Sequence, residues 1–352
     1  MMSPRGLEIV RQDIHKVQAA VLPWHRFSGA TVAVTGASGF MGSYLVRLLL
    51  SLHGAGKVDA PITVIAVVRD LEKARLRFAD VEPTAPLRLE FCDLCRPSGF
   101  TVEADWFIHA ASLASPKHYG SDPIGTLAPN VIGTWHLLQQ AQASKAKGFL
   151  FVSSSEVYGD AAERTSLAED DYGALDPTAA RSVYAESKRM GETLCVAWMH
   201  QCGLPVFIVR PFHTYGPGVD LADGRVFADF AADIVAGRDI RMASDGAARR
   251  AFCYISDALL GFFCVILKGE PGRPYNVANP QADLSVLELA QLMTSLFPER
   301  RLQVRHASPP VPSYLQSPHT RVLPSIAKLV ALGWQPAVNA ESGFKRMVES
   351  YL

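Results

Sequence analysis

TVAVTGASGFMGSYLVRLLLSL, residues 31–52, joins an apolar run to a second apolar run through a turn that contains three glycines. The run TVAV is typical of a buried strand, and the run after the turn has the length and pattern of a helix. Gly36, Gly39 and Gly42 stand three residues apart at this junction. Glycines in such a turn let backbone N–H groups and the helix N-terminus approach a pyrophosphate closely. The stretch therefore predicts a dinucleotide site.

The same alternation of apolar runs and helical periodicity continues to Pro211. Apolar strands that alternate with helices indicate a parallel sheet covered on both faces, so we expect an α/β fold with a Rossmann-type doubly wound sheet. After Pro211 the pattern changes to short strands mixed with helices, which predicts a smaller C-terminal substrate-binding lobe. Helices are expected near 224–236, 256–268, 284–297 and 338–351, and strands near 239–243, 252–255, 273–277 and 301–305.

The domain division follows from these patterns. Residues 7–22 space their apolar side chains as one amphipathic helix, so we expect an N-terminal helical extension over residues 1–28. The dinucleotide-binding domain is expected over 29–211, with 251–278 returning to it. The lobe is expected over 212–250 and 279–352.

Composition excludes several classes of protein. Lys plus Arg and Asp plus Glu both number 34, without a long run of one sign, so we expect neither a nucleic-acid partner nor a membrane surface, and the partner is a small molecule. Six scattered cysteines suit a reducing compartment, and the lone CxxC of Cys92 and Cys95 lacks a second pair to complete a metal site. No signal peptide or membrane span is visible, so we expect a cytoplasmic protein without a metal.

The end of the second expected strand bears on the identity of the dinucleotide. In folds of this kind an acid at this point binds the adenosine ribose. Here VVRD places Arg69 there, with Asp70 behind it. Arg69 would suit the 2′-phosphate of NADP, which we favour slightly, whereas Asp70 would suit the ribose of NAD. A third interpretation is that Arg69 is only a solvated charge in a loop. Asp93, after the third strand, is expected either to bind the adenine amino group or to cap a turn.

A tyrosine and a lysine four residues apart predict the chemistry. Tyr184 and Lys188 share one helical face at the carboxyl end of the sheet, where α/β sites lie. A phenol has an ordinary pKa of about 10, so Tyr184 acts as a base only where positive charge favours the phenolate. Lys188 and an oxidised nicotinamide both supply such charge. Ser154 can hydrogen-bond the same substrate oxygen, which completes a site for oxidising a hydroxyl.

Five motifs in this order identify a family resemblance: TGxxGxxG, HAAS at 109–112, SSSEVYG at 153–159, YxxxK at 184–188 and RPFHTYGPG at 210–218. The chain resembles the extended short-chain dehydrogenase/reductase superfamily over residues 30–350, within its nucleotide-sugar epimerase, dehydratase and decarboxylase group. Ser154–Gly159 and the stretches DGRVFADF and RRAFCYISD are most similar to the UDP-glucuronate decarboxylases. The resemblance implies an NAD- or NADP-dependent enzyme that acts through a 4-keto sugar, by decarboxylation or epimerisation.

The resemblance also implies the site residues. Catalysis falls to Tyr184, Lys188, Ser154 and Glu156, with Glu156 assisting proton transfer at C5. The cofactor is expected to contact Gly36, Ser38, Gly39, Phe40, Met41, Gly42, Arg69, Asp93, Leu94, Ala110, Ala111, Ser112, Asn130, Ser153, Tyr184, Lys188, Pro211 and His213. The nucleotide sugar is expected to contact Ser155, Glu156, His213, Arg225, Arg250 and Asn276. Of these, Arg250 would meet the diphosphate or the sugar carboxylate, and Arg225 and Asn276 would hold the nucleotide.

Some positions leave alternatives open. Ser155-Glu156 stands where a 4,6-dehydratase has Asp-Glu, so dehydration is not expected. His213 replaces the Asn of most relatives and Gly218 the Arg of decarboxylases, which makes the substrate's carboxylate less certain. Glu156 could instead order a loop, His213 could pack in the core, and Arg225 or Arg250 could form surface ion pairs.

Two other functions are considered. A 4-keto-sugar reductase would consume NADPH at each turnover, whereas internal redox cycling would retain the cofactor. A non-catalytic nucleotide-binding regulator would show a degenerate Tyr or Lys, and both are present here. The resemblance further implies a homodimer that pairs through the helices around 122–146 and 182–202.

Overall fold

The computed structural model describes residues 3–96, 99–160, 166–242, 244–306 and 323–352. Residues 1–2 of the expected extension and 307–322 of the expected lobe lie outside the described residues. Residue 243, at the end of one expected strand, lies outside them as well.

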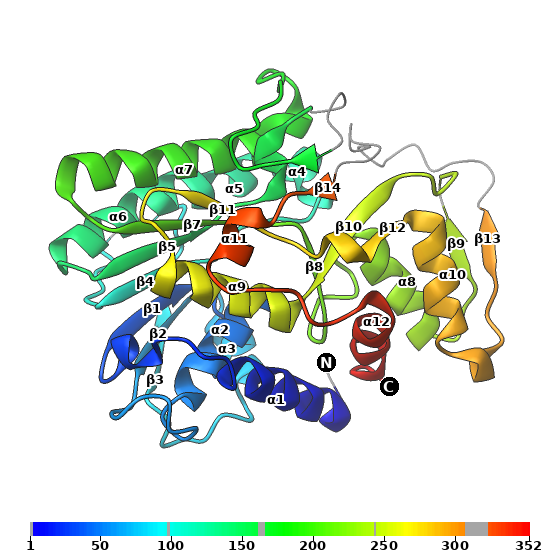
Figure 1. The fold of residues 1–352 in the computed structure, drawn as a ribbon, viewed down its shortest axis with the longest axis horizontal. Helices are drawn as coiled ribbons and strands as arrows, with labels where there is room; N and C mark the ends of the chain where they lie inside the picture. Colours follow the sequence, from blue (N-terminus) through cyan, green and yellow to red (C-terminus); the bar gives the residue numbers. More distant parts are fainter. Residues whose placement is uncertain (1–2, 97–98, 161–165, 243, 307–322) are drawn as a thin grey trace.

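Seven parallel strands form the main sheet, in the order β11-β7-β5-β4-β1-β2-β3 (Figure 1). The order reverses between β1 and β4, which is the point where ligands bind in open α/β sheets. The expected doubly wound parallel sheet is therefore confirmed. The strands are β1 (Thr31–Thr35), β2 (Thr63–Val68), β3 (Leu87–Phe91), β4 (Trp106–His109), β5 (Gly148–Val152), β7 (Val206–Pro211) and β11 (Pro274–Val277).

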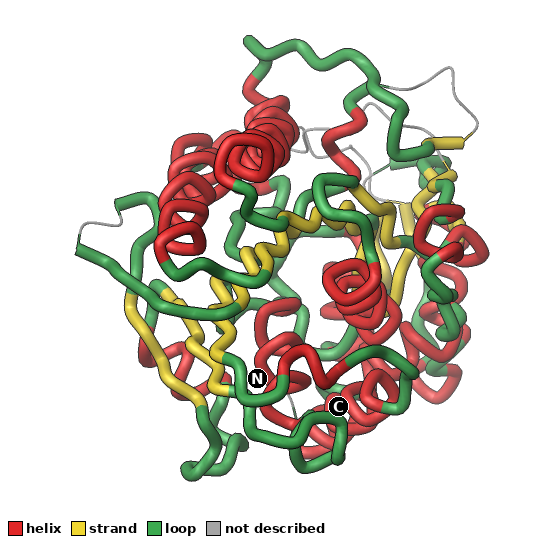
Figure 2. Tube along the Cα trace, turned by 60° about the vertical axis from the view of Figure 1, so that its left-hand side comes forward, coloured by secondary structure: helices red, strands yellow, loops and turns green. Residues whose placement is uncertain are grey.

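Helices cover both faces of this sheet (Figure 2). Successive residues of β1 enter different cores: Val32 and Val34 join the cluster with α2 and α9, whereas Ala33 joins the cluster with α6 and α7. This alternation follows from the pleat of a strand that is buried on both faces. The helices of this body are α2 (Phe40–Ser51), α3 (Leu71–Arg77), α4 (Lys117–Ser121), α5 (Pro123–Ala128), α6 (Thr134–Ala143), α7 (Val183–Cys202), α9 (Ile255–Lys268) and α11 (Ala327–Ala331).

The smaller lobe is built on a three-stranded sheet in the order β12-β10-β8 and a parallel pair of β13 and β9. Within the segment expected to return to the main domain, α9 packs on the main sheet and β11 joins it. Residues 251–254, however, belong to β10, which pairs in the smaller sheet. The lobe's elements are β8 (His213–Tyr215), α8 (Val226–Val235), β9 (Ile240–Met242), β10 (Arg249–Tyr254), β12 (Asp283–Ser285), α10 (Val286–Ser295), β13 (Val304–His306) and α12 (Ala340–Glu349).

Short elements complete the chain. Strands β6 (Ser166–Leu167) and β14 (Leu323–Pro324) pair in parallel. A π-helical turn, Pro129–Gly133, lies between α5 and α6. The 3-10 helices are Trp24–Phe27, Ser155–Tyr158, Ala180–Ser182, Pro280–Ala282 and Pro298–Arg300.

The N-terminal helix α1 (Pro4–Gln18) connects the two parts of the molecule. Ser3 caps it by accepting a hydrogen bond from the Gly6 amide at 3.1 Å. Its Asp13 is only 3% exposed and accepts hydrogen bonds from Arg346 of α12, at 2.7 Å, and from Tyr254 of β10, at 2.8 Å. The apolar side of α1 packs against α2 and α9. The predicted amphipathic helix therefore bridges the body and the lobe.

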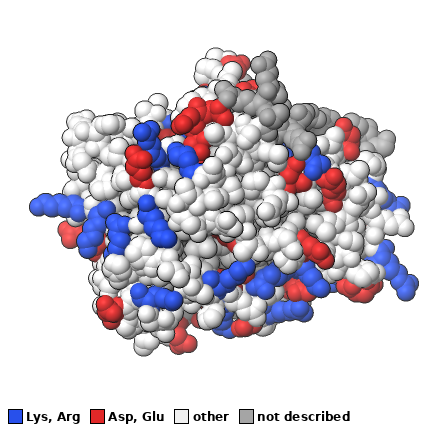
Figure 3. All heavy atoms as spheres, in the orientation of Figure 1, with Lys and Arg blue, Asp and Glu red and all other residues white. Residues whose placement is uncertain are grey.

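On the face shown in Figure 3, Lys and Arg side chains are interspersed with Asp and Glu. This mixture agrees with the balanced composition of the sequence. Among the described residues, no helix is both long enough and apolar enough to span a membrane.

Candidate active site

The three glycines of the first turn have different structural roles. Gly36 adopts a φ of +65°, and a Cβ atom there would lie 2.7 Å from the Cα of Ala111. A Cβ at Gly42 would lie 2.1 Å from the carbonyl oxygen of Gly36, so this glycine allows α2 to pack against the turn. Gly39 is the N-cap of α2, and its missing Cβ would meet only the Gly36 carbonyl, at 3.0 Å.

This turn fits a pyrophosphate. No side chain among the described residues caps the N-terminus of α2, so its first amides are not satisfied by a side chain. A helix of 12 residues with a bare N-terminus at Gly39 is a site for anions. Gly36 and Gly42 allow the close packing of the turn, and Gly39 leaves the approach to the amides open. The residues present therefore suit the phosphates of a dinucleotide.

The end of β2 presents Arg69 and Asp70, both exposed. Asp70 caps α3 by accepting a hydrogen bond from the Lys73 amide at 2.9 Å. One oxygen of the Asp70 carboxylate thus binds the first turn of α3. Arg69 places a positive charge at the carboxyl end of β2. Asp93 accepts a hydrogen bond from the Cys95 amide at 3.0 Å, so it caps a turn in this structure.

A buried ladder of hydrogen bonds joins the ends of β1 and β4. His109 contacts Thr35 Oγ1 through Nδ1 at 2.7 Å and the carbonyl of Pro129 through Nε2 at 3.1 Å. Burial, followed by the charge of Lys188, lowers the pKa of His109 to about 3, so the ring is neutral. Because a carbonyl only accepts, Nε2 carries the proton and Nδ1 accepts from Thr35. Thr35 in turn accepts from the Ala111 amide at 3.3 Å, which orients the Ala110–Ser112 segment.

Tyr184 lies at the start of α7 and is 5% exposed. Burial raises the pKa of its phenol to about 12, and Glu156 acts in the same direction, whereas the hydroxyls of Ser154 and Ser112 and the charge of Arg225 favour the phenolate. The Ser154 hydroxyl accepts a hydrogen bond from the Glu156 amide at 3.2 Å. Its own hydrogen therefore remains for the Tyr184 oxygen. The structure brings Tyr184, Ser154, Ser112 and Glu156 together.

Lys188 lies one turn further along α7 and is 2% exposed. Its Nζ donates to the carbonyl of Val152, at the end of β5, at 2.7 Å. Burial lowers the pKa of Lys188 to about 7, although the carboxylate of Glu192 acts in the opposite direction. The ammonium lies 5.8 Å from the centre of the Tyr184 ring, within range to influence the phenol electrostatically.

Asn130 lies in the π-helical turn before α6 and is fully buried. Its amide nitrogen donates to the Thr126 carbonyl at 3.1 Å and to Ser187 Oγ at 3.0 Å. Its Oδ1 has no hydrogen-bond partner within the described part of the chain. The residue therefore joins the π-helical turn to α7 and keeps one buried acceptor for a ligand or a water molecule.

Two residues of the site were not found from the sequence. Arg181, in the turn that leads into α7, forms an ion pair with Glu156 at 2.8 Å. Tyr119, on α4, stacks on Tyr184 with ring centres 5.1 Å apart and planes 12° apart. Tyr119 also contacts Arg181, whose guanidinium carbon lies 4.9 Å from the centre of the Tyr119 ring. Their positions were the only signal in the sequence, and it was weak. Arg181 stands three residues before Tyr184, and Tyr119 is the last residue of LASPKHY, residues 113–119.

The residues expected to bind substrate fall into separate places. Arg225 pairs with Asp223 at 2.6 Å, and its charge reaches Tyr184. Arg250 donates to the carbonyl of Arg249 at 2.7 Å, and the ring of His213 packs edge-on against Phe252. Ser155 begins the 3-10 helix that carries Glu156.

Asn276 departs from the expectation of a substrate contact. It is 0% exposed, and its amide nitrogen donates to the carbonyls of Leu167, at 3.1 Å, and Ser325, at 3.0 Å. Its oxygen accepts from the Tyr158 hydroxyl. Since the side chain is occupied by protein atoms, the structure does not bring Asn276 to the candidate site, and the residue joins β11 to β6 and to the residue that follows β14.

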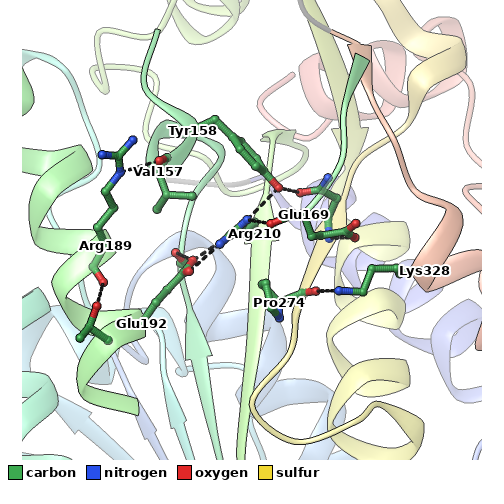
Figure 4. Close-up of polar contacts among 11 residues, drawn as sticks. Val157, Tyr158, Glu169, Arg189, Glu192, Arg210, Pro274 and Lys328 are labelled. Carbon is green, nitrogen blue, oxygen red and sulfur yellow. Dashed lines mark hydrogen bonds and ion pairs between the residues drawn. The ribbon is translucent and has the colours of Figure 1, made fainter. Parts of the chain in front are cut away.

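A buried ion pair joins strand β7 to helix α7, which carries Tyr184 and Lys188 (Figure 4). Arg210 of β7 binds Glu192 of α7 in a bidentate manner, at 2.9 and 2.7 Å, and also contacts the Tyr158 hydroxyl at 3.0 Å. Glu192 also accepts from Ser153. Ser153, expected at the cofactor, is thus held by α7 next to Ser154.

The expected absence of a metal site rested on the isolated CxxC. Among the residues that the structure describes, no group of three or more His, Cys, Asp or Glu side chains could hold a metal ion. Burial raises the pKa of the Cys92 thiol to about 11, which makes it a poor ligand and nucleophile at neutral pH.

The chain is similar in sequence to a known family of enzymes. A model of the NAD dependent epimerase/dehydratase family matches residues 32–278. UDP-glucuronic acid decarboxylase 1 of Arabidopsis thaliana is 33% identical over 322 residues, covering 91% of this chain and 69% of that protein. UDP-glucuronic acid decarboxylase 1 of Danio rerio is 32% identical over 327 residues, covering 91% and 72%.

Solved structures show the same fold. Epimerase Mth375 of Methanothermobacter thermautotrophicus superposes with a TM-score of 0.78 at 20% identity, covering 94% of each chain. UDP-glucuronic acid 4-epimerase of Bacillus cereus, solved with UDP-glucuronic acid and NAD, has a TM-score of 0.75 at 20% identity and covers 91% of this chain and 98% of that one. The family resemblance seen in the motifs is confirmed. The chain belongs to the NAD dependent epimerase/dehydratase family.

Proposed function

We propose that the protein decarboxylates a UDP-hexuronate through a 4-keto sugar, in the manner of a UDP-glucuronate decarboxylase. The observation that carries the proposal is the convergence of Tyr184, Ser154 and Lys188 beside the glycine turn, with Glu156 adjacent. The names of the curated relatives support a UDP-glucuronate substrate. Epimerisation through the same 4-keto sugar is the closest alternative outcome.

The residues have separable tasks. Tyr184 accepts the proton of the C4 hydroxyl, and Ser154 donates to the same oxygen. Arg225 places positive charge near the phenol, which favours its ionised form, and Lys188 adds to this charge when it is protonated. Gly39 and the N-terminus of α2 hold the phosphates of the dinucleotide. When bound, the nicotinamide supplies the hydride acceptor at C4 and later the hydride donor. The 4-keto group then weakens the bond from C5 to its carboxylate.

The test is a panel of UDP-, dTDP-, GDP- and CDP-sugars that includes UDP-glucuronate and UDP-galacturonate, with and without added NADPH. We expect release of carbon dioxide and a pentose product from UDP-glucuronate, without net consumption of NADPH. Tyr184→Phe is expected to abolish turnover while cofactor binding stays nearly intact. Unchanged turnover in this variant would refute the catalytic assignment, and no turnover on any sugar would favour a non-catalytic nucleotide-binding regulator.

We propose that Arg69 determines the choice of dinucleotide by donating hydrogen bonds to the 2′-phosphate of NADP. The exposed cation and the commitment of Asp70 to α3 support NADP, whereas the NAD-bound neighbour supports NAD. Calorimetric titration with NAD and NADP separates the two. We expect Arg69→Ala to weaken NADP binding about tenfold or more and to leave NAD binding within about twofold. Equal effects on both would refute the assignment of Arg69.

The same Arg69 favours a second candidate function, an NADPH-dependent 4-keto-sugar reductase. A net reductase must release its oxidised cofactor after each turnover. Stoichiometric loss of NADPH absorbance with a 4-keto-sugar substrate would support this function, and a cofactor retained through purification would support internal redox cycling.

We also propose a homodimer that forms through α5, α6 and α7. Large apolar side chains are exposed on these helices and on the π-helical turn between them: Ile124 (79%), Leu127 (38%), Ile132 (41%), Trp135 (46%) and Met190 (47%). A group of exposed apolar side chains on neighbouring helices favours contact with another protein surface. The helices are those for which the family resemblance implies pairing, so a second copy is the proposed partner.

A further inference from the structure

Arg181 lies over the ring of Tyr119, which in turn stacks on the phenol of Tyr184. It lies in the short helix Ala180–Ser182, directly before α7. Its guanidinium carbon lies 4.9 Å from the centre of the Tyr119 ring, and that ring stacks on Tyr184 at 5.1 Å. The N–H groups of a guanidinium lie in its own plane. When the guanidinium stacks on an aromatic face, these groups therefore point outward, parallel to the ring. The edge of Arg181 is thus held in a defined place beside Tyr119, whose ring links it to Tyr184.

The hydrogen-bonding capacity of Arg181 is only partly used. Its Nη2 binds Glu156 Oε2 at 2.8 Å, with the two side chains 19% and 27% exposed. Its Nε is buried and has no hydrogen-bond partner among the residues that the structure describes. Buried N–H groups are seldom left without an acceptor, and a guanidinium binds carboxylates through two neighbouring N–H groups. The free donor therefore calls for a further acceptor at this place.

The surrounding charges indicate which acceptor fits. Glu156 and Arg225 both act on the phenol of Tyr184, and Glu156, Arg181 and Arg225 all act on that of Tyr119. These charged groups therefore share one small region. A substrate carboxylate that enters beside Tyr184 would be repelled by Glu156, and a cation at Arg181 offsets this repulsion. A neutral hexose needs no such cation.

We propose that Arg181 selects the substrate by binding the C5 carboxylate of a UDP-hexuronate through Nε and an Nη nitrogen. The inference rests on the proposed function and deepens it, because it names the residue that separates hexuronates from neutral hexoses. In the complex, Arg181 bridges the substrate carboxylate and Glu156. Glu156 then lies beside the carbon from which carbon dioxide leaves.

The test measures binding rather than turnover. In the full chain loaded with NAD or NADP, Tyr184→Phe provides a parent that binds without reacting. UDP-glucuronate, UDP-glucose and UDP are titrated into this parent and into the same protein with Arg181→Gln. We expect Arg181→Gln to weaken UDP-glucuronate binding about tenfold or more, with UDP-glucose and UDP within about twofold. Equal weakening of all three ligands overturns the inference, as does a parent that binds the two sugars equally.

Two further variants keep the result interpretable. Arg181→Lys retains the charge without the planar pair of donors, so it should recover only part of the affinity for UDP-glucuronate. Arg250→Gln is the matched control: if Arg250 meets the diphosphate, all three ligands should weaken together. Loss of selectivity in Arg250→Gln with none in Arg181→Gln would transfer the role to Arg250 and overturn the inference.

Failure of the inference and failure of the proposed function can be told apart. A protein that binds UDP-glucuronate selectively through Arg181 but releases no carbon dioxide supports the inference and refutes decarboxylation. A protein that releases carbon dioxide from UDP-glucuronate while Arg181→Gln keeps full selectivity supports decarboxylation and overturns the inference. Circular dichroism and the thermal midpoint of each variant establish that the fold is retained before either conclusion is drawn.

Discussion

At the scale of single residues, Ser154 favours the ionised form of Tyr184, whereas burial opposes it. Its oxygen accepts from the Glu156 amide, so its one hydrogen is directed to the phenol and lowers the pKa that burial raises. Ser154→Ala should therefore move the ascending, acidic limb of kcat/KM to higher pH and lower the rate at neutral pH about 10²-fold. Ser154→Thr keeps a hydroxyl and should restore the wild-type limb. A pH–rate profile that is identical in Ser154→Ala would contradict this role.

Lys188 makes stability depend on pH. Its pKa is about 7 in the folded protein, below the ordinary value of 10.5, so between these pH values the unfolded chain binds a proton that the folded chain does not. The free energy of unfolding therefore rises with pH in this range, by up to about 1.4 kcal/mol per pH unit from this group. Urea unfolding of the protein without dinucleotide at pH 7 and pH 9 should show this rise, and Lys188→Met should reduce it. Equal rises in both proteins would count against the lowered pKa.

At the scale of elements, the Arg210–Glu192 pair joins β7 to α7. Arg210 is 1% exposed and Glu192 13%, so both are desolvated. Arg210→Met leaves Glu192 buried without its cation and should lower the free energy of unfolding by about 3–5 kcal/mol. Adding Glu192→Leu should recover much of this loss, since it removes the unpaired charge. Arg238→Met, which breaks a pair whose arginine is 64% exposed, is the control and should change stability by less than about 1 kcal/mol.

At the scale of the whole molecule, the exposed apolar side chains on α5–α7 predict the assembly. Trp135 is 46% exposed and packs edge-on against Trp198 at 4.7 Å, so it presents a rigid aromatic surface. Trp135→Glu places a charge there and should convert the dimer to a monomer in light scattering with size-exclusion chromatography. Val21→Glu, at a site that is 93% exposed and outside these helices, should leave the dimer intact. A monomeric wild type would refute the proposed interface.

Several features of the fold and site were predictable because they depend on neighbours in the chain. The seven-stranded parallel sheet follows from continuous apolar runs, and the amphipathic helix α1 follows from spacings of three and four. The Tyr184–Lys188 spacing places both side chains on one face of α7. The family assignment, confirmed by the comparisons, rests on such short motifs. The individual cofactor and substrate contacts stay predictions.

Other features depend on which distant residues pack together, and local patterns carry no information about that. The family resemblance implies a substrate contact for Asn276, yet its side chain is buried and bonded to Tyr158, which is 118 positions away. Arg181 meets Glu156 across 25 positions and also lies over the ring of Tyr119, and no local sequence pattern indicates these contacts. Periodicity and glycine spacing act within a strand, a turn or a helix, and so the amino-acid sequence alone defines the sheet and the pairing of Tyr184 with Lys188 on one helical face. Which side chains contact a buried charge or a buried ring depends on packing between distant parts of the chain. The polar surroundings of Tyr184 are therefore defined only by the tertiary structure.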